Sequence, residues 1–185
     1  MRHPLLLLAA FAVVIPCAWA AGPPKSPALG ASDAGPAADP RDLPNFARVA
    51  PGIYRGGAPT FRGMERLKAM GVRTVIDLRI ERKGQREEAA AAEALGLKRI
   101  RIPMGREAPT AKQVATFLDT LADPAGRPVF VHCQHGADRT GAMVGIWRAR
   151  RQNWGWDRIW PEMRRYGFKP WLSELKGAVL ASTRG

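Results

Sequence analysis

The sequence predicts an α/β domain in which helices flank a mostly parallel β-sheet. Between residues 60 and 132, segments of helical periodicity alternate with short apolar segments, which is the order of elements in βαβ units. Gly71 and Gly96 follow the first two helical segments, as glycines commonly do at helix C-termini. Residues 128–132 form a short, mostly apolar run, which is typical of a strand buried on both faces of a parallel sheet.

Each element before residue 103 follows from a local pattern. Two extended stretches, 46–49 and 53–55, flank the turn signal Pro51-Gly52 and predict a hairpin. The alternating segments that follow are a helix at 60–70, a strand at 73–78, a helix at 85–95 and a strand at 97–102.

The second half of the domain is expected to contain four more helices and one strand. Thr110 and Gln113 form a capping box, and the helix that they begin places Val114, Phe117, Leu118 and Leu121 on one face. After the strand at 128–132, helices are expected from Thr140, at 157–166 and at 170–180. A basic, Trp-rich region could bind nucleic acid by stacking, but its spacing favours a helical core with the arginines facing solvent. The residues assigned to that core are Trp147, Ile159, Trp160, Met163 and Trp171.

The first 42 residues are expected to lie outside the folded domain. Residues 1–20 combine a basic start, an apolar stretch and Ala18-Trp19-Ala20, which is the pattern of a secretory signal peptide. Residues 21–42 are rich in Ala, Pro and Gly and predict a flexible linker. The domain is therefore expected over residues 43–185 of an exported protein, periplasmic or secreted, whose mature chain has no integral membrane span.

Charge and cysteine content narrow the function. The net charge of +13 favours an anionic partner. Removal of the leader leaves Cys133 as the only cysteine, so it is either buried and inert or kept for its reactivity. A zinc site made by His132, Cys133 and His135 is disfavoured, because three ligands within four residues and no distant fourth ligand fit the usual spacings poorly.

The residues around Cys133 favour the reactive interpretation. Cys133 lies at the carboxyl end of the strand at 128–132, where ligands gather in parallel sheets, and a helix N-terminus suited to anions is expected at Thr140. Arg139 offers a planar fork of donors that matches two phosphate oxygens. Gly136 allows a tight loop, and the hydroxyl of Thr140 is near enough in sequence to donate to a thiolate. The pattern predicts a phosphate-binding loop around an activated cysteine.

The loop sequence His-Cys-Gln-His-Gly-Ala-Asp-Arg-Thr-Gly at 132–141 resembles the Cys-x5-Arg active-site loop of the protein tyrosine and dual-specificity phosphatase superfamily. Residues 54–59, 74–79 and 155–168 are also similar to a bacterial, exported, dual-specificity-like branch. The resemblance implies that Cys133 forms a phosphocysteine intermediate and that Arg139 stabilises the phosphoryl group, with no metal or cofactor required. The substrate-binding residues that it implies are Gln134, His135, Gly136, Ala137 and Thr140.

The resemblance leaves two candidates for the general acid. Much of the superfamily carries an aspartate in a loop before the active-site strand, whereas residues 103–109 contain only Glu107 as an acid. Some members with an aspartate at the place of Asp138 use that residue, so Asp138 is placed ahead of Glu107.

Neighbouring polar residues are given structural roles. His132 is expected to orient the loop, and Asp77 to make a local hydrogen bond inside its strand. Arg55 and Arg79 lie near strand ends and could flank the site, but the default expectation is that they are solvated.

The expected activity is hydrolysis of a phosphate monoester. Phosphotyrosine in a protein is the leading substrate, although the same loop in the superfamily also serves phosphoserine, phosphothreonine and inositol phosphates, and the positive charge favours a highly anionic substrate. The alternatives from other classes are a phosphate-binding module without turnover and a basic nucleic-acid-binding protein.

Overall fold

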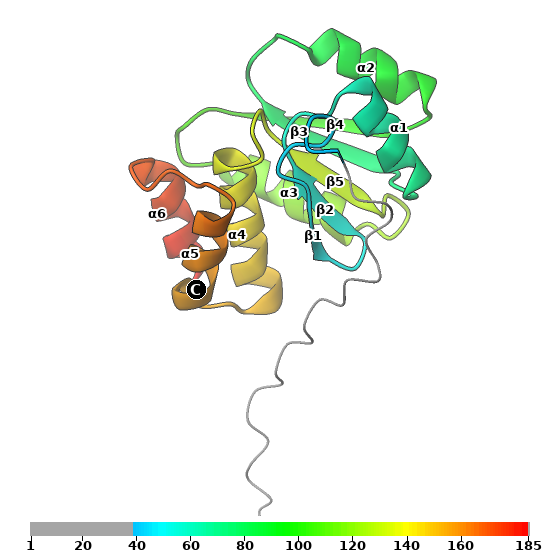
Figure 1. Cartoon of the computed structure of the whole chain (residues 1–185). Coiled ribbons are helices and arrows are strands. Elements are labelled where there is room, and N and C mark those ends of the chain that lie inside the picture. Colours follow the sequence, from blue (N-terminus) through cyan, green and yellow to red (C-terminus); the bar gives the residue numbers. More distant parts are fainter. Residues whose placement is uncertain (1–38, 185) are drawn as a thin grey trace, which may run out of the picture. The chain divides into compact units, whose positions relative to one another are not determined.

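A computed structural model describes residues 39–184 of the chain (Figure 1). The predictions of a signal peptide at 1–20 and of a linker at 21–38 lie outside the described residues. Asp42, at the end of the predicted linker, accepts hydrogen bonds from both the backbone and the hydroxyl of Thr60. In the part of the chain that is described, no helix is long and apolar enough to cross a membrane.

Within residues 39–184, five strands and six helices follow one another in the order that the sequence predicts. The strands are β1 (Ala47–Ala50), β2 (Ile53–Gly56), β3 (Thr74–Arg79), β4 (Lys98–Met104) and β5 (Val129–His132). The helices are α1 (Phe61–Ala69), α2 (Gln85–Ala94), α3 (Ala111–Ala122), α4 (Asp138–Gln152), α5 (Trp156–Arg165) and α6 (Ser173–Ser182).

The sheet has the order β1-β2-β5-β3-β4. β2, β5, β3 and β4 pair in parallel, and β1 is an antiparallel edge strand that forms a hairpin with β2. The predicted α/β class with a mostly parallel sheet is therefore confirmed. β5 is the central strand and has a parallel neighbour on each side. Cys133 therefore lies directly beyond the middle of the sheet.

Alternation along β5 divides its side chains between two apolar cores. Val129 and Val131 pack with α3, α4, α5 and α6, whereas Phe130 packs with α1 and α2. Figure 1 shows α1 and α2 on one side of the sheet and α4, α5 and α6 on the other. Both faces of β5 are thus buried, as its apolar sequence predicts.

The helix after the loop at 133–137 begins earlier than predicted. α4 starts at Asp138 and uses no side-chain cap, so the expected start at Thr140 is two residues late. The backbone turns at Gly136, which has φ of 71°, and enters the helix two residues later. Asp138 and Arg139 therefore belong to the first turn of α4 and not to a loop.

The assignments in the Trp-rich region are partly wrong. Trp147, Ile159 and Met163 are buried as predicted, but Trp171 is 72% exposed, because it lies in the turn before α6, where helical spacing does not apply. Arg148 is also buried, although the arginines were expected to face solvent. It pairs with Glu162 at 2.6 Å.

Candidate active site

The loop after β5 folds tightly over the end of β2. Cys133 is 2% exposed, and the backbone of Gly136 lies so close to β2 that a Cβ there would be 2.4 Å from the carbonyl carbon of Gly56. Only glycine fits this contact and its left-handed φ. The carbonyl oxygen of Gly136 accepts a hydrogen bond of 2.8 Å from Nη2 of Arg55.

Arg55 supports the loop from below, which corrects the expectation of a solvated side chain. It is 1% exposed, and its guanidinium lies 4.0 Å from the ring centroid of Tyr166. Burial lowers the pKa of Arg55 to about 10, so the side chain is still charged at neutral pH. Arg55 is the third residue of β2, and nothing in the sequence around it indicates that its side chain lies beneath the loop that follows β5.

Arg139 is held by Glu81, a residue between β3 and α2 that the sequence analysis missed. Nη1 and Nη2 donate to the two carboxylate oxygens at 2.8 and 3.0 Å. Burial lowers the pKa of Arg139, but the hydrogen bond to Glu81 and the charge of Cys133 outweigh it and leave that pKa above its ordinary value. The bond from Arg139 in turn lowers the pKa of Glu81.

His132 contacts the loop from the sheet side. Its Nδ1 lies 3.2 Å from the carbonyl oxygen of Cys133 and its Nε2 3.3 Å from Oε1 of Glu88. The ring is completely buried and stacks on Phe130, with ring centroids 5.6 Å apart. These contacts hold the backbone at Cys133, the residue expected to be the nucleophile, and the supporting role expected of His132 stays a prediction.

Below His132 lies a network of four charged residues, the buried Asp77, Arg79 and Glu88 and the half-buried Arg99. Each carboxylate pairs with both guanidinium groups, at 2.5 to 2.9 Å. Asp77 also accepts the backbone N–H of Arg79 at 2.9 Å, which is the local hydrogen bond predicted for it. Arg79 is 3% exposed, so its expected solvation is wrong.

Burial raises the pKa of Asp77 and of Glu88, but bonds from Arg79 and His132 respectively outweigh it and leave both pKa values lowered. Ligand atoms of Asp77, Glu88 and His132 also lie within 4.8 Å of one another. The arginines already occupy both carboxylates, so the arrangement is that of an internal ion-pair network and not of an open metal site.

Above the loop lies a cavity of about 430 Å³. Gln134, His135, Asp138 and Arg139 line it from the loop and the start of α4. Gly136, Ala137 and Thr140 are buried and do not line it, and Thr140 Oγ1 has no hydrogen-bond partner in this structure. The opposite walls come from segments distant in sequence, with Ile80, Glu81, Gly105, Arg106, Glu107, Lys169, Trp171, Leu172 and Leu175.

Both candidate acids reach this cavity. Oδ1 of Asp138 accepts the backbone N–H of Lys169 at 2.9 Å, and Oδ2 lies 4.0 Å from Lys169 Nζ. Glu107 is exposed and folds over Gly105, where its carboxylate occupies the space that a side chain would need. The structure thus brings the two carboxylates to one site. Through its bond to Lys169, Asp138 also anchors the segment before α6.

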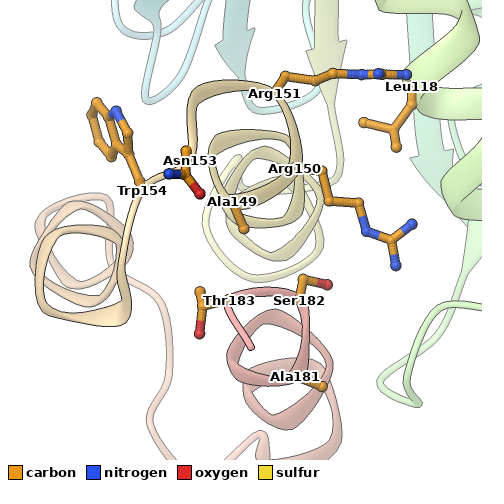
Figure 2. A pocket seen from close by; sticks show the side chains of 9 residues that line it. All are labelled: Leu118, Ala149, Arg150, Arg151, Asn153, Trp154, Ala181, Ser182 and Thr183. Atoms are coloured by element: carbon orange, nitrogen blue, oxygen red, sulfur yellow. The ribbon is translucent and has the colours of Figure 1, made fainter. Parts of the chain in front are cut away.

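A larger hollow, of about 610 Å³, lies at the other end of α4 (Figure 2). Ala149, Arg150, Arg151, Asn153, Ser182 and Thr183 contribute to its walls, and Figure 2 shows Arg151 extending toward Leu118 of α3. No cysteine, histidine or acid lines it. Arginines in the last turn of α4 are accounted for by the negative end of the helix dipole, so this hollow is no rival for the active site.

The fold and the loop define a dual-specificity-type member of the protein tyrosine phosphatase superfamily. Residues 38–159 match the family described as "DSP-PTPase phosphatase fused to NAD+ Kinase", and the chain belongs to that family.

The chain is also similar to three proteins with different descriptions. "Probable NAD kinase 2, chloroplastic" of Oryza sativa is 37% identical over 102 residues, which are 52% of this chain and 10% of that protein. "Inositol diphosphatase SIW14" of Saccharomyces cerevisiae is 29% identical over 67% of this chain and 46% of its own length. "Dual specificity protein phosphatase TpbA" of Pseudomonas aeruginosa is 27% identical over 67% of this chain and 55% of its own.

The crystal structure of the SIW14 core catalytic domain with citrate aligns with a TM-score of 0.65 and 25% identity, covering 73% of this chain and 83% of that one. The chain thus spans about a tenth of the rice protein and about half of the other two relatives.

Proposed function

We propose that this chain hydrolyses phosphate monoesters through a phosphocysteine intermediate. The observation that carries the proposal is the position of Cys133, which follows the central strand directly and is buried. The residues just after it, Gln134, His135, Asp138 and Arg139, line one cavity. A helix N-terminus with free N–H groups and one arginine fork is what a transferring phosphoryl group requires.

The reaction has two steps. The thiolate of Cys133 attacks phosphorus, the bond to the ester oxygen breaks, and an acid protonates the leaving oxygen. Water then attacks the phosphocysteine, releases inorganic phosphate and returns the thiolate, with the same acid, now a carboxylate, accepting the proton of the water. Asp138 is the proposed acid and Glu107 the alternative.

Arg139 binds the phosphoryl oxygens in both steps. Glu81 is bound by Nη1 and Nη2, which leaves the side of the guanidinium that carries Nε for the phosphate. A planar group with five donors can serve a carboxylate and a phosphate at once. Glu81 is therefore a positioning residue, since it holds the fork in one orientation before the substrate arrives.

Phosphotyrosine in a protein is the leading substrate, supported by the similarity to a dual-specificity protein phosphatase. A highly anionic inositol phosphate is the second candidate. It is supported by Arg106 and Lys169 on the cavity wall and by the similarity to an inositol diphosphatase. Both substrates need the same chemistry at Cys133.

The test is phosphate release from p-nitrophenyl phosphate by the chain from Ala21 onward. We expect turnover by the wild type, none by Cys133→Ser, and a loss of about 10²–10³-fold in kcat for Arg139→Lys, which keeps the charge but not the fork. Circular dichroism controls for folding. Binding of inorganic phosphate without turnover by the wild type would instead indicate a phosphate-binding module.

We also propose that the protein is exported. The basic start, apolar stretch and small residues of positions 1–20 support this. Amino-terminal sequencing of protein from the periplasm or medium should begin at Ala21, and an intact Met1 in the cytoplasm would contradict it.

A further inference from the structure

Large apolar side chains are exposed at three described positions, Phe61, Ile80 and Trp171, which are 54%, 59% and 72% exposed. Single exposed apolar residues are ordinary on protein surfaces. Ile80 and Trp171, however, come from segments 91 positions apart in the sequence and line the same cavity above the Cys133 loop. Phe61 lines none of the cavities described for this chain.

Trp171 is placed by contacts that begin at the catalytic helix. The backbone N–H of Lys169 is bound by Asp138 in the first turn of α4. Two further backbone bonds close the turn, from Leu172 N to Lys169 O at 3.2 Å and from Ser173 N to Trp171 O at 2.9 Å. The exposed indole of Trp171 therefore belongs to a turn whose backbone is hydrogen-bonded to the first turn of α4.

Ile80 is placed in a similar way from the other wall. It follows β3 and precedes Glu81, whose carboxylate is bound to Arg139. Each apolar residue thus lies within two positions of a residue that contacts the first turn of α4. A phosphate seated on the loop would leave its carrier group in the cavity that Ile80 and Trp171 line.

We propose that Ile80 and Trp171 form an apolar clamp for the group that carries the phosphate and make the site selective for aryl phosphates, phosphotyrosine among them. This inference rests on the phosphate site of the proposed function and not on its turnover. A flat aromatic ring gains from burial against isoleucine and from stacking on indole. An inositol ring bearing several phosphates offers no apolar face of that kind. Arg106 and Lys169 attract both classes of anion, so they do not discriminate between them.

Binding of two non-hydrolysable probes tests the clamp without turnover. Phenylphosphonate and methylphosphonate share the phosphoryl head and differ in the carrier group. In the wild type, we expect phenylphosphonate to bind about tenfold more tightly by calorimetry. The ratio should fall toward one in Trp171→Ala, fall about threefold in Ile80→Ala, and be retained in Trp171→Phe. Phe61→Ala is the matched control and should keep the wild-type ratio.

Kinetics supply the second readout. For Trp171→Ala, kcat/KM should fall about tenfold with a phosphotyrosine peptide and less than twofold with glycerol 2-phosphate or inositol hexakisphosphate. Equal losses on all substrates, or an unchanged probe ratio in Trp171→Ala, would overturn the clamp while leaving cysteine-dependent hydrolysis intact. If the wild type hydrolyses nothing yet the probe ratio behaves as expected, the proposed function fails and the clamp stands.

Discussion

The charged groups beneath the Cys133 loop and those above it differ in burial and in partners. Beneath it, Asp77 and Glu88 are almost inaccessible, and each pairs with both Arg79 and Arg99. Above it, the side chain of Glu81 is 46% exposed and pairs with one arginine, Arg139.

The difference separates support from recognition. Charges that have lost their water need fixed partners, because an unpaired buried charge costs several kcal/mol. The network under His132 can therefore hold one geometry for the loop backbone. The carboxylate of Glu81 keeps much of its hydration, so its pairing with Arg139 can be weakened or shared with a second anion at little cost in free energy. Such a contact is suited to a position beside an arriving phosphate.

The largest expected effect is on stability and comes from the lower region. Glu88→Ala leaves Arg79 and Arg99 with one carboxylate between them and should lower the free energy of unfolding by about 3–5 kcal/mol. Chemical denaturation measures this, with Glu81→Ala as the matched control, for which the expected loss is at most about 1 kcal/mol. Similar losses in the two variants would remove the distinction between the regions.

The sequence predicted the upper region better than the lower. The segment 133–139 is contiguous and its residues suit one chemistry, so Cys133 and Arg139 could be proposed from the local sequence alone. The network joins β3, α2 and β4, and nothing local shows that Arg79 is turned inward. Asp77 was assigned correctly only because its bond to the backbone of Arg79 spans two positions.

The fold was predictable because its elements carry periodic patterns and caps. Thr110 and Gln113 form the expected capping box, and Val114, Phe117, Leu118 and Leu121 are buried. Trp171 was misassigned because a helical period was extended into a turn. A partner such as Glu81 could have been sought at the carboxyl end of β3, since that strand neighbours β5 in a parallel sheet.

The next effect is on catalysis and comes from the upper region. Asp138→Asn keeps an oxygen that can accept the Lys169 N–H, so the anchoring bond survives while the acid is lost. We expect kcat on phenyl phosphate, a poor leaving group, to fall about a hundredfold or more, and on p-nitrophenyl phosphate far less. Glu107→Gln is the control and should change both rates little.

The opposite pattern would assign the acid to Glu107. A selective loss on phenyl phosphate in Glu107→Gln, with loss of the basic limb of its pH profile and equal slowing of both substrates in Asp138→Asn, would show that Asp138 only anchors the segment before α6. Either outcome shows which of the two carboxylates, Asp138 or Glu107, is the general acid and which has a structural role.

The smallest effect is the pH dependence of the Glu81–Arg139 pair. Its hydrogen bond lowers the pKa of Glu81 below the ordinary 4.5, so the folded state binds this proton less readily than the unfolded state does. The stabilisation is therefore fully present above about pH 5 and is lost as pH falls through the lowered pKa. Because the carboxylate is nearly half exposed, screening limits the difference between wild type and Glu81→Gln to about 1 kcal/mol or less.

Denaturation of both proteins from pH 3 to 7, at low and high salt, should give a difference that shrinks toward the acid end and with added salt. A difference of several kcal/mol in the free energy of unfolding that does not change with salt would show that Glu81 behaves like the carboxylates of the buried network. The distinction between the two regions would then be wrong.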